Sequence, residues 1–479
     1  MDKKVKFIAS KEEDITSWYT DVCLKAELMD YAKTKGFIIY RPDGYAIWEE
    51  IQSYLNAHFK NVGVRNVYLP SLIPMSLLNK EKEHIQGFAP ECAVVTKGGD
   101  KLLAEEMVIR PTSETLFCDY YKNILHSYND LPIINNQWCS VIRWEKTTRP
   151  FLRGSEFLWQ EGHTLHEKED EARLFALEIL KIYRKMGQEL LAIPFVAGKK
   201  VESEKFAGAK ETYTIEALMP DNQALQCGTS HYLGTSFCKH FDIKYQNKDN
   251  TLEFPHYTSW GVSTRLLGAL IMIHGDNNGL VLPPKVAPTQ VVIIPIKGNE
   301  NKEVNQVSNK VYEKLTKGGI RTILDNNMKV TPGFKFSKYE LKGIPIRIEI
   351  GPKDIENNHI TLTYRYNGEK SQIKLDDKLV TNINSALDNI QQNMYTRALE
   401  SLEKRIIKCT TKEEIEKTLS SKLGFAKFMY SDTKEEEDYF KEKFNATPRV
   451  IPFDEVPFGD IDPITNKKAE KVIYYSRAY

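Results

Sequence analysis

The stretch VIRWEKTTRPFLRGSEFLWQEGHT, from Val141 to Thr164, decides the fold of this chain. It reads as two strands joined by a charged loop, and Arg143 and Glu145, two residues apart, are expected to share one face of the first strand. After Arg153, aromatic, acidic and histidine side chains occupy every second position from Phe157 to His163. Such a face makes a poor core and suits a ligand that combines a phosphate, a flat ring and an amine.

Composition narrows the class of protein. The 479 residues suggest about three domains at roughly 150 residues each. The N-terminus lacks the apolar stretch of a signal peptide, and no segment reaches the ~20 apolar residues of a membrane span, so we expect no membrane association. The seven cysteines are scattered and odd in number, which argues against a disulfide framework and for the reducing cytoplasm. A net charge of +1 means that any nucleic acid would be held by local patches.

A proline-rich segment, VLPPKVAPTQVVIIPI, marks the first domain boundary. Its prolines stiffen an extended linker, and VVIIPI is typical of a buried parallel strand. Helices expected over 304–318 and 334–342 then alternate with the strands IRTILD and GIPIRIEIG, which indicates a small α/β domain. A charged helix is expected over 382–407, and residues 409–479 are expected to form a third domain.

The N-terminal part has a mixed pattern. Helical periodicity covers 10–35, 44–60 and 169–191, and the second of these leads into the proline-closed strand VRNVYLPSLIP. Short strands dominate 193–254. Strands that do not follow a βαβ rhythm predict an antiparallel sheet with flanking helices, an α+β plan.

A second unusual stretch is GVSTRLLGALIMIHGDNNG, which places Arg265 in an otherwise apolar helix. A buried arginine without an anionic partner is costly, so either an acidic side chain or a bound anion should meet it. A structural ion pair is the ordinary explanation for an isolated case. Here Arg143 and Arg153 are also unusual, and three converging guanidinium groups suit a polyphosphate.

The simple nucleotide-binding signatures are absent, because the chain contains neither a GxxxxGK[ST] loop nor a strand–GxGxxG–helix unit. The string KFSKY, Lys335 to Tyr339, is similar to the KMSKS loop of class I aminoacyl-tRNA synthetases. No HIGH-like partner stands in an early βα turn, so we set this interpretation aside.

The pattern strand–Arg-X-Glu–loop–Arg–strand, followed by an apolar helix with Gly-X-X-X-Arg, resembles motifs 2 and 3 of class II aminoacyl-tRNA synthetases. Residues 45–74 are similar to motif 1, which forms the dimer interface in that class. Four strings together resemble the prolyl-tRNA synthetase family: RPTSE, EFLWQEGHT, LQCGTSH and SWGVSTR. The resemblance is strongest over 40–290, and the ending KVIYYSRAY is similar to the archaeal/eukaryote-type branch.

The resemblance implies an α+β catalytic domain built on an antiparallel sheet, followed by an α/β anticodon-binding domain and a small α/β C-terminal domain. The expected boundaries are 1–287, 288–404 and 405–479, with motif 1 at about 44–75, motif 2 at about 141–164 and motif 3 at about 259–284. It further implies a homodimer that activates L-proline with ATP to prolyl-adenylate and pyrophosphate. The prolyl group would then pass to the 3′ end of tRNA(Pro).

Carried over residue by residue, the resemblance places Arg143 at the α-phosphate of ATP and Arg265 at the γ-phosphate, as the two catalytic residues. No general base is needed, because the attacking carboxylate is already ionised, so positioning and charge stabilisation would supply the catalysis. Glu211 is the expected ligand of Mg²⁺. The implied ATP-binding set is Arg143, Glu145, Arg153, Phe157, Gln226, Thr229 and Arg265.

For proline, the resemblance implies carboxylate and hydroxyl acceptors for the secondary ammonium and an apolar wall around the ring. The implied set is Thr112, Glu114, Arg143, Trp159, Glu161, His163, Phe206, His231, Ser259 and Gly261. A pocket of this kind rejects a smaller side chain weakly, so alanine and cysteine should be activated at some rate. Only 111 residues separate Arg153 from Arg265, so the long editing insertion of bacterial-type relatives is expected to be absent.

In the second domain the resemblance assigns the anticodon to Glu340, Lys342, Arg347 and Lys353, although these charges could equally form a solvated sheet face. The four-cysteine zinc site of many relatives is impossible in the third domain, which contains only Cys409, so we expect no structural zinc. Another Cys/His set has no standard finger spacing: His163, His166, Cys227, His231, Cys238 and His240. The terminal Tyr479 is compatible with a C-terminus that reaches back to the catalytic domain.

Two alternatives remain open at this point. One is another class II synthetase, and the other is a non-catalytic paralogue that binds tRNA. The second alternative predicts loss of Arg143, Glu145 or Arg265, and all three are present.

Overall fold

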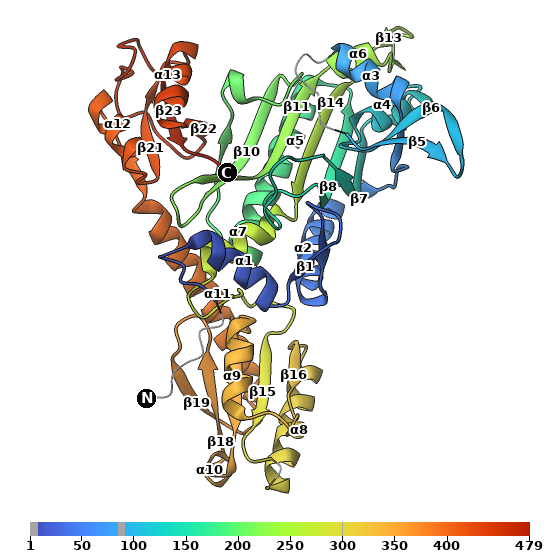
Figure 1. The fold of residues 1–479 in the computed structure, drawn as a ribbon. Coiled ribbons are helices and arrows are strands. Elements are labelled where there is room, and N and C mark those ends of the chain that lie inside the picture. Colours follow the sequence, from blue (N-terminus) through green and yellow to red (C-terminus); the bar gives the residue numbers. More distant parts are fainter. Residues whose placement is uncertain (1–7, 85–91, 299) are drawn as a thin grey trace.

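The computed structural model describes residues 8–84, 92–298 and 300–479 and has three lobes (Figure 1). The largest lobe contains the N-terminal part of the chain. A second lobe lies below it in Figure 1, and a third lies beside it at the top. The long helix α11, Leu379–Glu403, runs from the second lobe to the third.

The first lobe contains seven helices in the described residues: α1 Ile15–Lys25, α2 Pro42–Asn61, α3 Met75–His84, α4 Glu114–Ile124, α5 Glu169–Met186, α6 Ser236–His240 and α7 Arg265–His274. Its longer strands are β6 Lys101–Ile109, β7 Ile133–Ile142, β8 Glu156–His166, β10 Glu211–Leu218, β11 Ala224–Gly234 and β14 His256–Ser263. Its shorter strands are β1 Met29–Tyr31, β2 Ile38–Tyr40, β3 Arg65–Asn66, β4 Leu72–Pro74, β5 Val94–Gly98, β9 Val196–Lys199, β12 Tyr245–Gln246 and β13 Leu252–Glu253.

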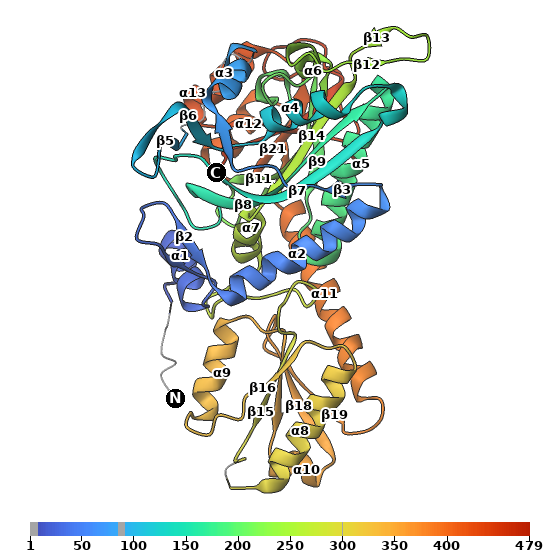
Figure 2. The ribbon, with the colours of Figure 1, turned by 90° about the vertical axis from the view of Figure 1, so that its right-hand side faces the viewer.

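The central sheet of this lobe is antiparallel over β9-β10-β11-β14-β8-β7, and only the edge strand β3 joins in parallel. Helix α5 packs on β10, β11 and β14, and α2 crosses the same side of the sheet (Figure 2). The expected α+β plan is therefore confirmed. Because helices cover one face of these strands, side chains on the other face are free to form a site.

The sheet does not stop at the first lobe. The third lobe contains β20 Ile406–Lys408, α12 Lys412–Ser420, β21 Phe425–Tyr430, α13 Lys434–Phe444, β22 Thr447–Pro452 and β23 Lys471–Ser476. Strand β22 pairs with β9, so the strands of both lobes form one eleven-stranded sheet. A buried ion cluster crosses this junction, with Glu216 of β10 contacting Lys200 at 2.9 Å and Arg449 of β22 at 3.1 Å.

The second lobe is a five-stranded sheet in the order β16-β15-β17-β18-β19. Its strands are β15 Val291–Pro295, β16 Thr322–Leu324, β17 Ile346–Ile350, β18 His359–Tyr364 and β19 Lys370–Lys374, and its helices are α8 Lys302–Lys317, α9 Pro332–Leu341 and α10 Pro352–Glu356. β15 is buried at all five positions and pairs in parallel with β16 and β17. The prediction of a buried parallel strand after the proline linker is confirmed.

Three expected helices were too long. The helix expected over 10–35 ends at Lys25, because Glu27 adopts a left-handed φ of 63° and the chain then forms the β1–β2 hairpin. α5 gives way to a π-helical turn at Gly187–Leu191. The helix expected over 382–407 ends at Glu403, and the following residues form β20.

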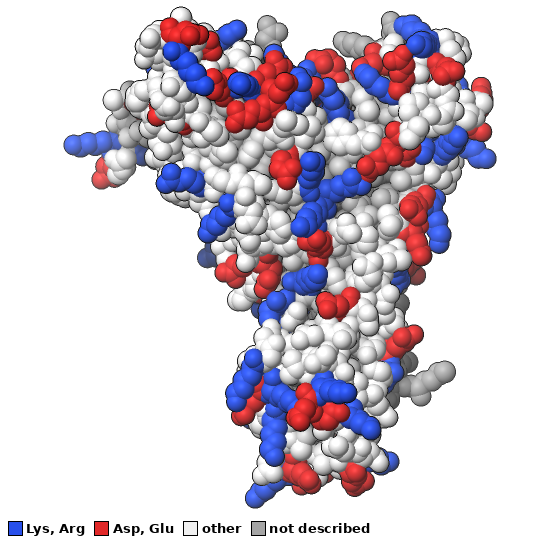
Figure 3. All heavy atoms as spheres, turned by 180° about the vertical axis from the view of Figure 1, so that it is seen from behind, with Lys and Arg blue, Asp and Glu red and all other residues white. Residues whose placement is uncertain are grey.

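The surface carries charges of both signs interspersed over the face shown in Figure 3, in keeping with the net charge of +1. Within the described residues, none of the helices is both long and apolar enough to cross a bilayer.

Candidate active site

A cavity of about 290 Å³ opens on the face of β8, β11 and β14 that α5 does not cover. Alternation along the strands decides which side chains reach it. Gln160 accepts a hydrogen bond from Tyr183 of α5, and Ser230 donates to the carbonyl of Ala176 in the same helix. Their neighbours Glu161 and His231 consequently point away from α5 and into the cavity.

Strand register arranges the cavity side chains in two rows across the sheet. In one row Thr212 pairs with His231, His231 with Ser259, and Ser259 with His163. The second row, two residues along, reads Thr229, Gly261 and Glu161, and Gln137 of β7 stands opposite Glu161 without lining the cavity. Residues that are far apart in sequence therefore meet because the antiparallel register brings them opposite one another.

The structure brings most of the expected site residues into this one cavity. Those that line it are Thr112, Glu114, Arg143, Phe157, Trp159, Glu161, His163, Phe206, Gln226, Thr229, His231, Ser259, Gly261 and Arg265. Glu145, Arg153 and Glu211 are not among the lining residues.

Arg143 and Arg265 are held by backbone oxygens. Arg143 Nε donates to the carbonyl of Pro111 at 3.0 Å, and its guanidinium lies 5.4 Å from the ring centre of Phe157. Arg265 Nε donates to the carbonyl of Leu152 at 3.1 Å. Among the residues that the structure describes, neither arginine forms an ion pair with a carboxylate, so the structural ion pair considered for Arg265 is not found.

Positive charges lie close to one another at this end of the cavity. Burial lowers the pKa of Arg265, and repulsion from Arg153 and Arg143 lowers it further. Burial also lowers the pKa of Arg143, although the charges of Glu114 and Glu161 partly offset that effect. A polyanion placed here would relieve this repulsion.

The expectation that Arg143 and Glu145 share a strand face was wrong. β7 ends at Ile142, and the amide of Arg143 makes a last cross-strand bond to the carbonyl of Ser155 at 2.9 Å. The amide of Glu145 then bonds to the carbonyl of Arg143 at 2.7 Å, a tight turn that breaks the two-residue alternation. Arg143 therefore enters the cavity without Glu145.

The other end of the cavity is acidic and tightly bonded. Glu161 is 2% exposed and accepts from the Ser113 amide at 3.1 Å and from Gln137 Nε2 at 2.8 Å. Burial alone would raise the pKa of Glu161, but its hydrogen bonds from His163, Ser113 and Gln137 outweigh burial and lower it. Glu161 is therefore a fixed negative charge.

Sequence reasoning missed the residues that hold these side chains. Ser113 lies within the string RPTSE, so the sequence could have identified it as a site residue. No local pattern identifies Gln137 as a partner of Glu161. Tyr257 Oη contacts His163 Nδ1 at 2.6 Å, and the ring of Phe117 stacks on His163 at 4.0 Å between centres. These contacts fix the position of the His163 ring.

Two buried polar groups face the cavity with capacity to bind. Glu114 is 5% exposed and accepts a short hydrogen bond from Thr112 Oγ1. Ser259 Oγ is buried and has no hydrogen-bond partner in the described structure. Buried polar groups normally have partners, so an unsatisfied hydroxyl beside a cavity points to a ligand.

An apolar wall closes the cavity beside these groups. The rings of Phe206 and His231 lie 4.7 Å apart, and Thr212 Oγ1 contacts His231 Nδ1 at 3.0 Å. Burial lowers the pKa of His231 to about 3, so this ring is neutral at pH 7. At Gly261 an added Cβ would lie 2.9 Å from the Gln160 carbonyl oxygen, so this position must stay small.

Glu211 lies outside the cavity lining and already has partners. Lys199 Nζ contacts its carboxylate at 2.7 Å and Arg173 Nε at 3.0 Å. In the described part of the chain, the group with metal-ligand geometry is Glu114, Glu161 and His163, whose ligand atoms lie within 4.8 Å of one another. Within the described residues, no group with metal-ligand geometry joins His163 to the other members of the Cys/His set.

The four expected anticodon residues lie in three different places. Glu340 and Arg347 line a cavity of about 500 Å³ in the second lobe, and the Arg347 guanidinium lies 4.1 Å from the ring centre of Phe336. Lys342 instead contacts Glu27 and, at 2.8 Å, Asp43 of the first lobe.

The remaining expected anticodon residue, Lys353, is exposed on α10. It is not among the residues that line the cavity of the second lobe.

The chain ends beside the loop that carries Arg149. The guanidinium of Arg149 lies 5.3 Å from the ring centre of Tyr479, and Tyr479 Oη donates to Asp221 at 2.5 Å. The last residue therefore packs on the first lobe, close to the loop between β7 and β8.

Three family models match the chain in succession. Residues 97–274 match the tRNA synthetase class II core domain (G, H, P, S and T), and residues 290–384 match an anticodon binding domain. Residues 412–479 match the prolyl-tRNA synthetase C-terminal domain.

Curated relatives match over essentially the whole chain. A protein of Clostridium botulinum (strain Loch Maree / Type A3), named proline–tRNA ligase, is 51% identical over 479 residues, which cover 100% of this chain and 99% of the relative. Proteins of the same name from Lachnoclostridium phytofermentans and from Aster yellows witches'-broom phytoplasma are 51% and 52% identical, again covering 100% of this chain and 99% of each relative.

Proposed function

This chain belongs to the proline–tRNA ligase family, and on that premise we propose how its residues perform the reaction. Members of the family are ligases that form an aminoacyl-tRNA, from the amino acid, ATP and tRNA. The observation that carries the assignment to this cavity is its polarity: arginines without carboxylate partners at one end, and buried carboxylates at the other.

At the nucleotide end, Arg143 binds the α-phosphate and Arg265 the γ-phosphate. Their guanidinium groups are positioned by backbone carbonyls, which leaves their positive charge available to an anion. Phe157 stacks on the adenine, and Gln226 and Thr229 flank the nucleotide from β11. Glu145 and Arg153 remain assigned to ATP and would have to turn toward it from the loop between β7 and β8.

At the amino-acid end, Thr112 and Glu114 accept hydrogen bonds from the secondary ammonium of proline. Glu161 and His163 hold this end of the cavity, and the Ser259 hydroxyl is free to bond to the substrate. Trp159, Phe206 and the neutral His231 enclose the pyrrolidine ring, with Gly261 leaving room at the floor of the cavity.

The chemical step joins these two ends. One carboxylate oxygen of proline attacks the α-phosphorus, and the bond from that phosphorus to the bridging oxygen of pyrophosphate breaks. Arg143 and Arg265 stabilise the negative charge on the phosphates, so positioning and electrostatics supply the catalysis.

Class II synthetases in general need Mg²⁺, which when bound would neutralise charge on the phosphates of ATP. We propose Glu211 as a ligand of Mg²⁺. It could bind the ion only after its ion pairs with Lys199 and Arg173 have broken.

In the second lobe we assign Glu340 and Arg347 to the anticodon of tRNA(Pro). Unpaired bases are recognised by stacking and by hydrogen bonds to their edges. Arg347 lies over the Phe336 ring and donates to Glu349 at 2.9 Å, so a base that binds here would meet a guanidinium with a fixed orientation. Lys353 remains a candidate on the exposed surface. For Lys342, we propose that the ion pairs with Glu27 and Asp43 give way when the anticodon loop binds.

We retain the domain boundaries 1–287, 288–404 and 405–479, and the archaeal/eukaryote-type branch, as proposals.

A homodimer through motif 1 is supported by three large exposed side chains there, Tyr45, Tyr68 and Leu72. A cytoplasmic location is supported by the seven cysteines, none of which is paired in a disulfide in the described residues.

The absence of a zinc site is also a proposal. The third lobe has one cysteine, Cys409, packed in its apolar core, and metal analysis of the purified protein should give less than stoichiometric zinc.

The test of the proposed reaction is ATP–pyrophosphate exchange with each of the twenty amino acids. Proline should stimulate exchange most strongly, and Arg265→Ala should lower the rate about 10²–10³-fold, as for loss of one preorganised donor to transition-state charge. Arg184→Ala, an exposed arginine on α5, is the matched control and should retain full activity. Stronger stimulation by another amino acid, or full exchange by Arg265→Ala, would refute the assignment.

A further inference from the structure

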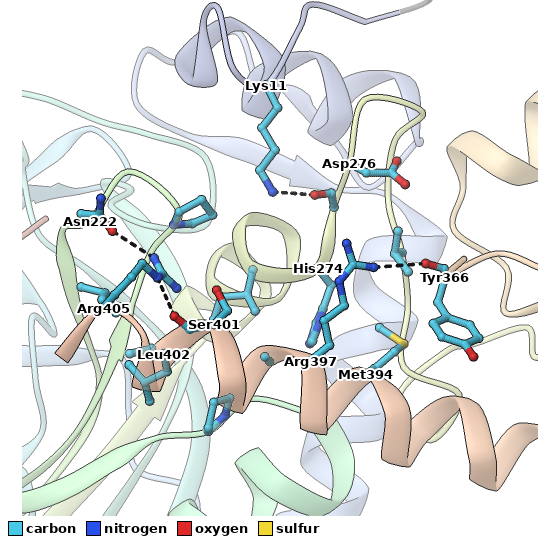
Figure 4. A pocket seen from close by; sticks show the side chains of 18 of the residues that line it. Lys11, Asn222, His274, Asp276, Tyr366, Met394, Arg397, Ser401, Leu402 and Arg405 are labelled. Carbon is cyan, nitrogen blue, oxygen red and sulfur yellow. Dashed lines mark hydrogen bonds between the residues drawn. The ribbon is translucent and has the colours of Figure 1, made fainter. Parts of the chain in front are cut away.

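A second cavity, of about 450 Å³, lies where the three lobes meet (Figure 4). Its walls come from the C-terminal end of α7, from α11 and from the turn between β10 and β11. Lys11 reaches it from the N-terminal segment, and Arg397 and Arg405 reach it from α11 and the residues just beyond. The proposed reaction does not use this cavity.

The ammonium of Lys11 is bonded to backbone oxygens at the end of α7. Lys11 Nζ donates to the carbonyls of Met272 at 2.9 Å and Gly275 at 2.5 Å, and it lies 4.6 Å from the ring centre of Trp18. These contacts hold the positive charge in place and do not neutralise it.

The two arginines are held in the same way. Arg405 donates to the carbonyls of Ser401 at 2.9 Å and Met219 at 2.8 Å, and Arg397 makes one long bond to the carbonyl of Tyr366 at 3.4 Å. Over residues 8–84, 92–298 and 300–479, neither these arginines nor Lys11 forms an ion pair with a carboxylate. Three cations therefore border one cavity without a carboxylate at ion-pair distance in the described residues, although the charge of Asp221 acts on Arg405.

The acidic and titratable groups of the cavity do not balance these charges. Asp276 accepts two bonds from Arg365, at 2.6 and 2.8 Å, so its charge is already matched. Glu12 is exposed and accepts from Asn277 at 2.6 Å. Burial lowers the pKa of His274 to about 4, so its ring is neutral at pH 7.

The three cations repel one another. Burial lowers the pKa of Lys11 to about 8; the charges of Asp276 and Glu12 oppose this shift, and those of Arg397 and Arg405 add to it. An anion between them would replace repulsion with attraction, and it would be less screened by salt than one bound on an open surface.

We propose that this cavity is a binding site for a small phosphate anion with two or more negative charges, either a free polyphosphate or the phosphate chain of a nucleotide. The fork of an arginine matches two phosphate oxygens, and a lysine ammonium binds phosphate as a point charge. The half-buried Lys11 favours a small ligand over the backbone of a rigid RNA stem, which could not follow the cavity inward. The anion would bridge α7, α11 and the 219–222 turn, and so would join the three lobes.

The experiment uses tripolyphosphate as the probe and isothermal titration calorimetry as the measurement, without Mg²⁺. An Arg265→Ala background weakens phosphate binding at the active site. In that background we expect one saturable site, whose affinity falls about tenfold or more in Arg397→Gln and again in Arg405→Gln. Lys404→Gln, an exposed cation at the same end of α11, is the matched control and should leave the affinity unchanged.

Arg397 is exposed, so its substitution is not expected to impair folding, and the thermal midpoints of all variants in the absence of ligand check this point. Absence of a saturable site in the Arg265→Ala background would overturn the proposal, as would equal affinities in the Arg397→Gln and Lys404→Gln variants. If Arg397→Gln and Arg405→Gln weaken tRNA binding but not tripolyphosphate binding, the cations serve RNA and the proposal is wrong. None of these outcomes depends on whether the chain activates proline.

Discussion

At the scale of single residues, the proposed active site depends on charged groups that are held by neutral partners. Arg143 and Arg265 donate to carbonyl oxygens, so on the proposed assignment a phosphate would meet a guanidinium that is already oriented. At the opposite end, Glu161 is saturated with hydrogen bonds, whereas Glu114 accepts one side-chain bond, from Thr112. Glu161 therefore supports the site, whereas Glu114 can accept a hydrogen bond from the substrate.

The role of Glu114 leads to a first residue-scale prediction. Glu114→Gln should raise the KM for proline about 10–100-fold, because a hydrogen bond between charged groups contributes roughly 1.5–3 kcal/mol. The KM for ATP should change little, and proline-dependent pyrophosphate exchange measures both. Glu178→Gln on α5 is the control, and equal KM values for proline in the two variants would remove Glu114 from the ammonium site.

A second residue-scale prediction concerns Glu436 in the third lobe. Its side chain is 1% exposed, and as an ionised carboxylate it finds no hydrogen-bond donor among the described residues, whereas in its protonated form it can donate to Asp462. Burial, followed by the neighbouring Asp462, raises the pKa of Glu436 to about 10. The folded chain therefore keeps this proton over a pH range in which the unfolded chain has lost it.

The sign of the pH effect follows from this difference. The stabilisation is complete below the ordinary glutamate pKa of about 4.3 and is lost as pH rises toward 10. Glu436→Gln should flatten this decline and stabilise the fold by roughly 1–3 kcal/mol at pH 8.5. Thermal midpoints from pH 5 to pH 9 test this, with the exposed Glu442→Gln on the same helix as the control. Parallel pH profiles for Glu436→Gln and the wild type would contradict it.

At the scale of elements, β22 makes the third lobe part of the catalytic sheet. The cluster of Lys200, Glu216 and Arg449 lies across this junction, and Glu216 is fully buried. A buried ion cluster is weak evidence of added stability, yet breaking one is costly because charge is left without a partner.

This cluster gives an element-scale prediction. Glu216→Gln should lower the free energy of unfolding by about 3–5 kcal/mol, since two buried cations then face each other. Replacing all three residues with apolar side chains of similar volume should recover most of that loss. Urea unfolding of the variants measures both effects, and a loss below 1 kcal/mol for Glu216→Gln would show that water reaches the cluster.

At the scale of the whole molecule, the second lobe is tied to the first by charge pairs. Lys342 contacts Glu27 and Asp43, and Arg365 contacts Asp276. The segment between Arg153 and Arg265 forms helices and strands of the first lobe, namely β8, α5, β9 to β11, α6 and β12 to β14, with their connections. That segment has no length left for a separate editing domain.

A whole-molecule prediction follows from this use of the chain. The purified protein should activate alanine, because a missing methylene or two costs only ~1–3 kcal/mol each, and should hydrolyse Ala-tRNA(Pro) no faster than the uncatalysed rate. Incubation of pre-formed Ala-tRNA(Pro) with the protein, beside Pro-tRNA(Pro) as the control substrate, tests this. Faster loss of the alanyl ester than in buffer alone would show an editing activity that the fold does not reveal.

By itself the sequence determined the elements whose signal is local. The two-residue alternation from Phe157 to His163 predicted β8, and the apolar run VVIIPI predicted β15, because side-chain period and burial are set within a few residues. The strings around Arg143 and Arg265 likewise indicated the chemistry of the site, since buried arginines call for either an acidic side chain or a bound anion.

Only the tertiary structure decided what depends on partners far along the chain. The support of Glu161 by Ser113 and Gln137, and the pairing of β22 with β9, arise from register across the sheet and carry no local pattern. The turn after Ile142, which separates Glu145 from Arg143, follows from one hydrogen bond that ends a strand. The sequence could not predict the cationic cavity at the junction of the lobes either, because only the packing of the lobes brings Lys11 near Arg397 and Arg405.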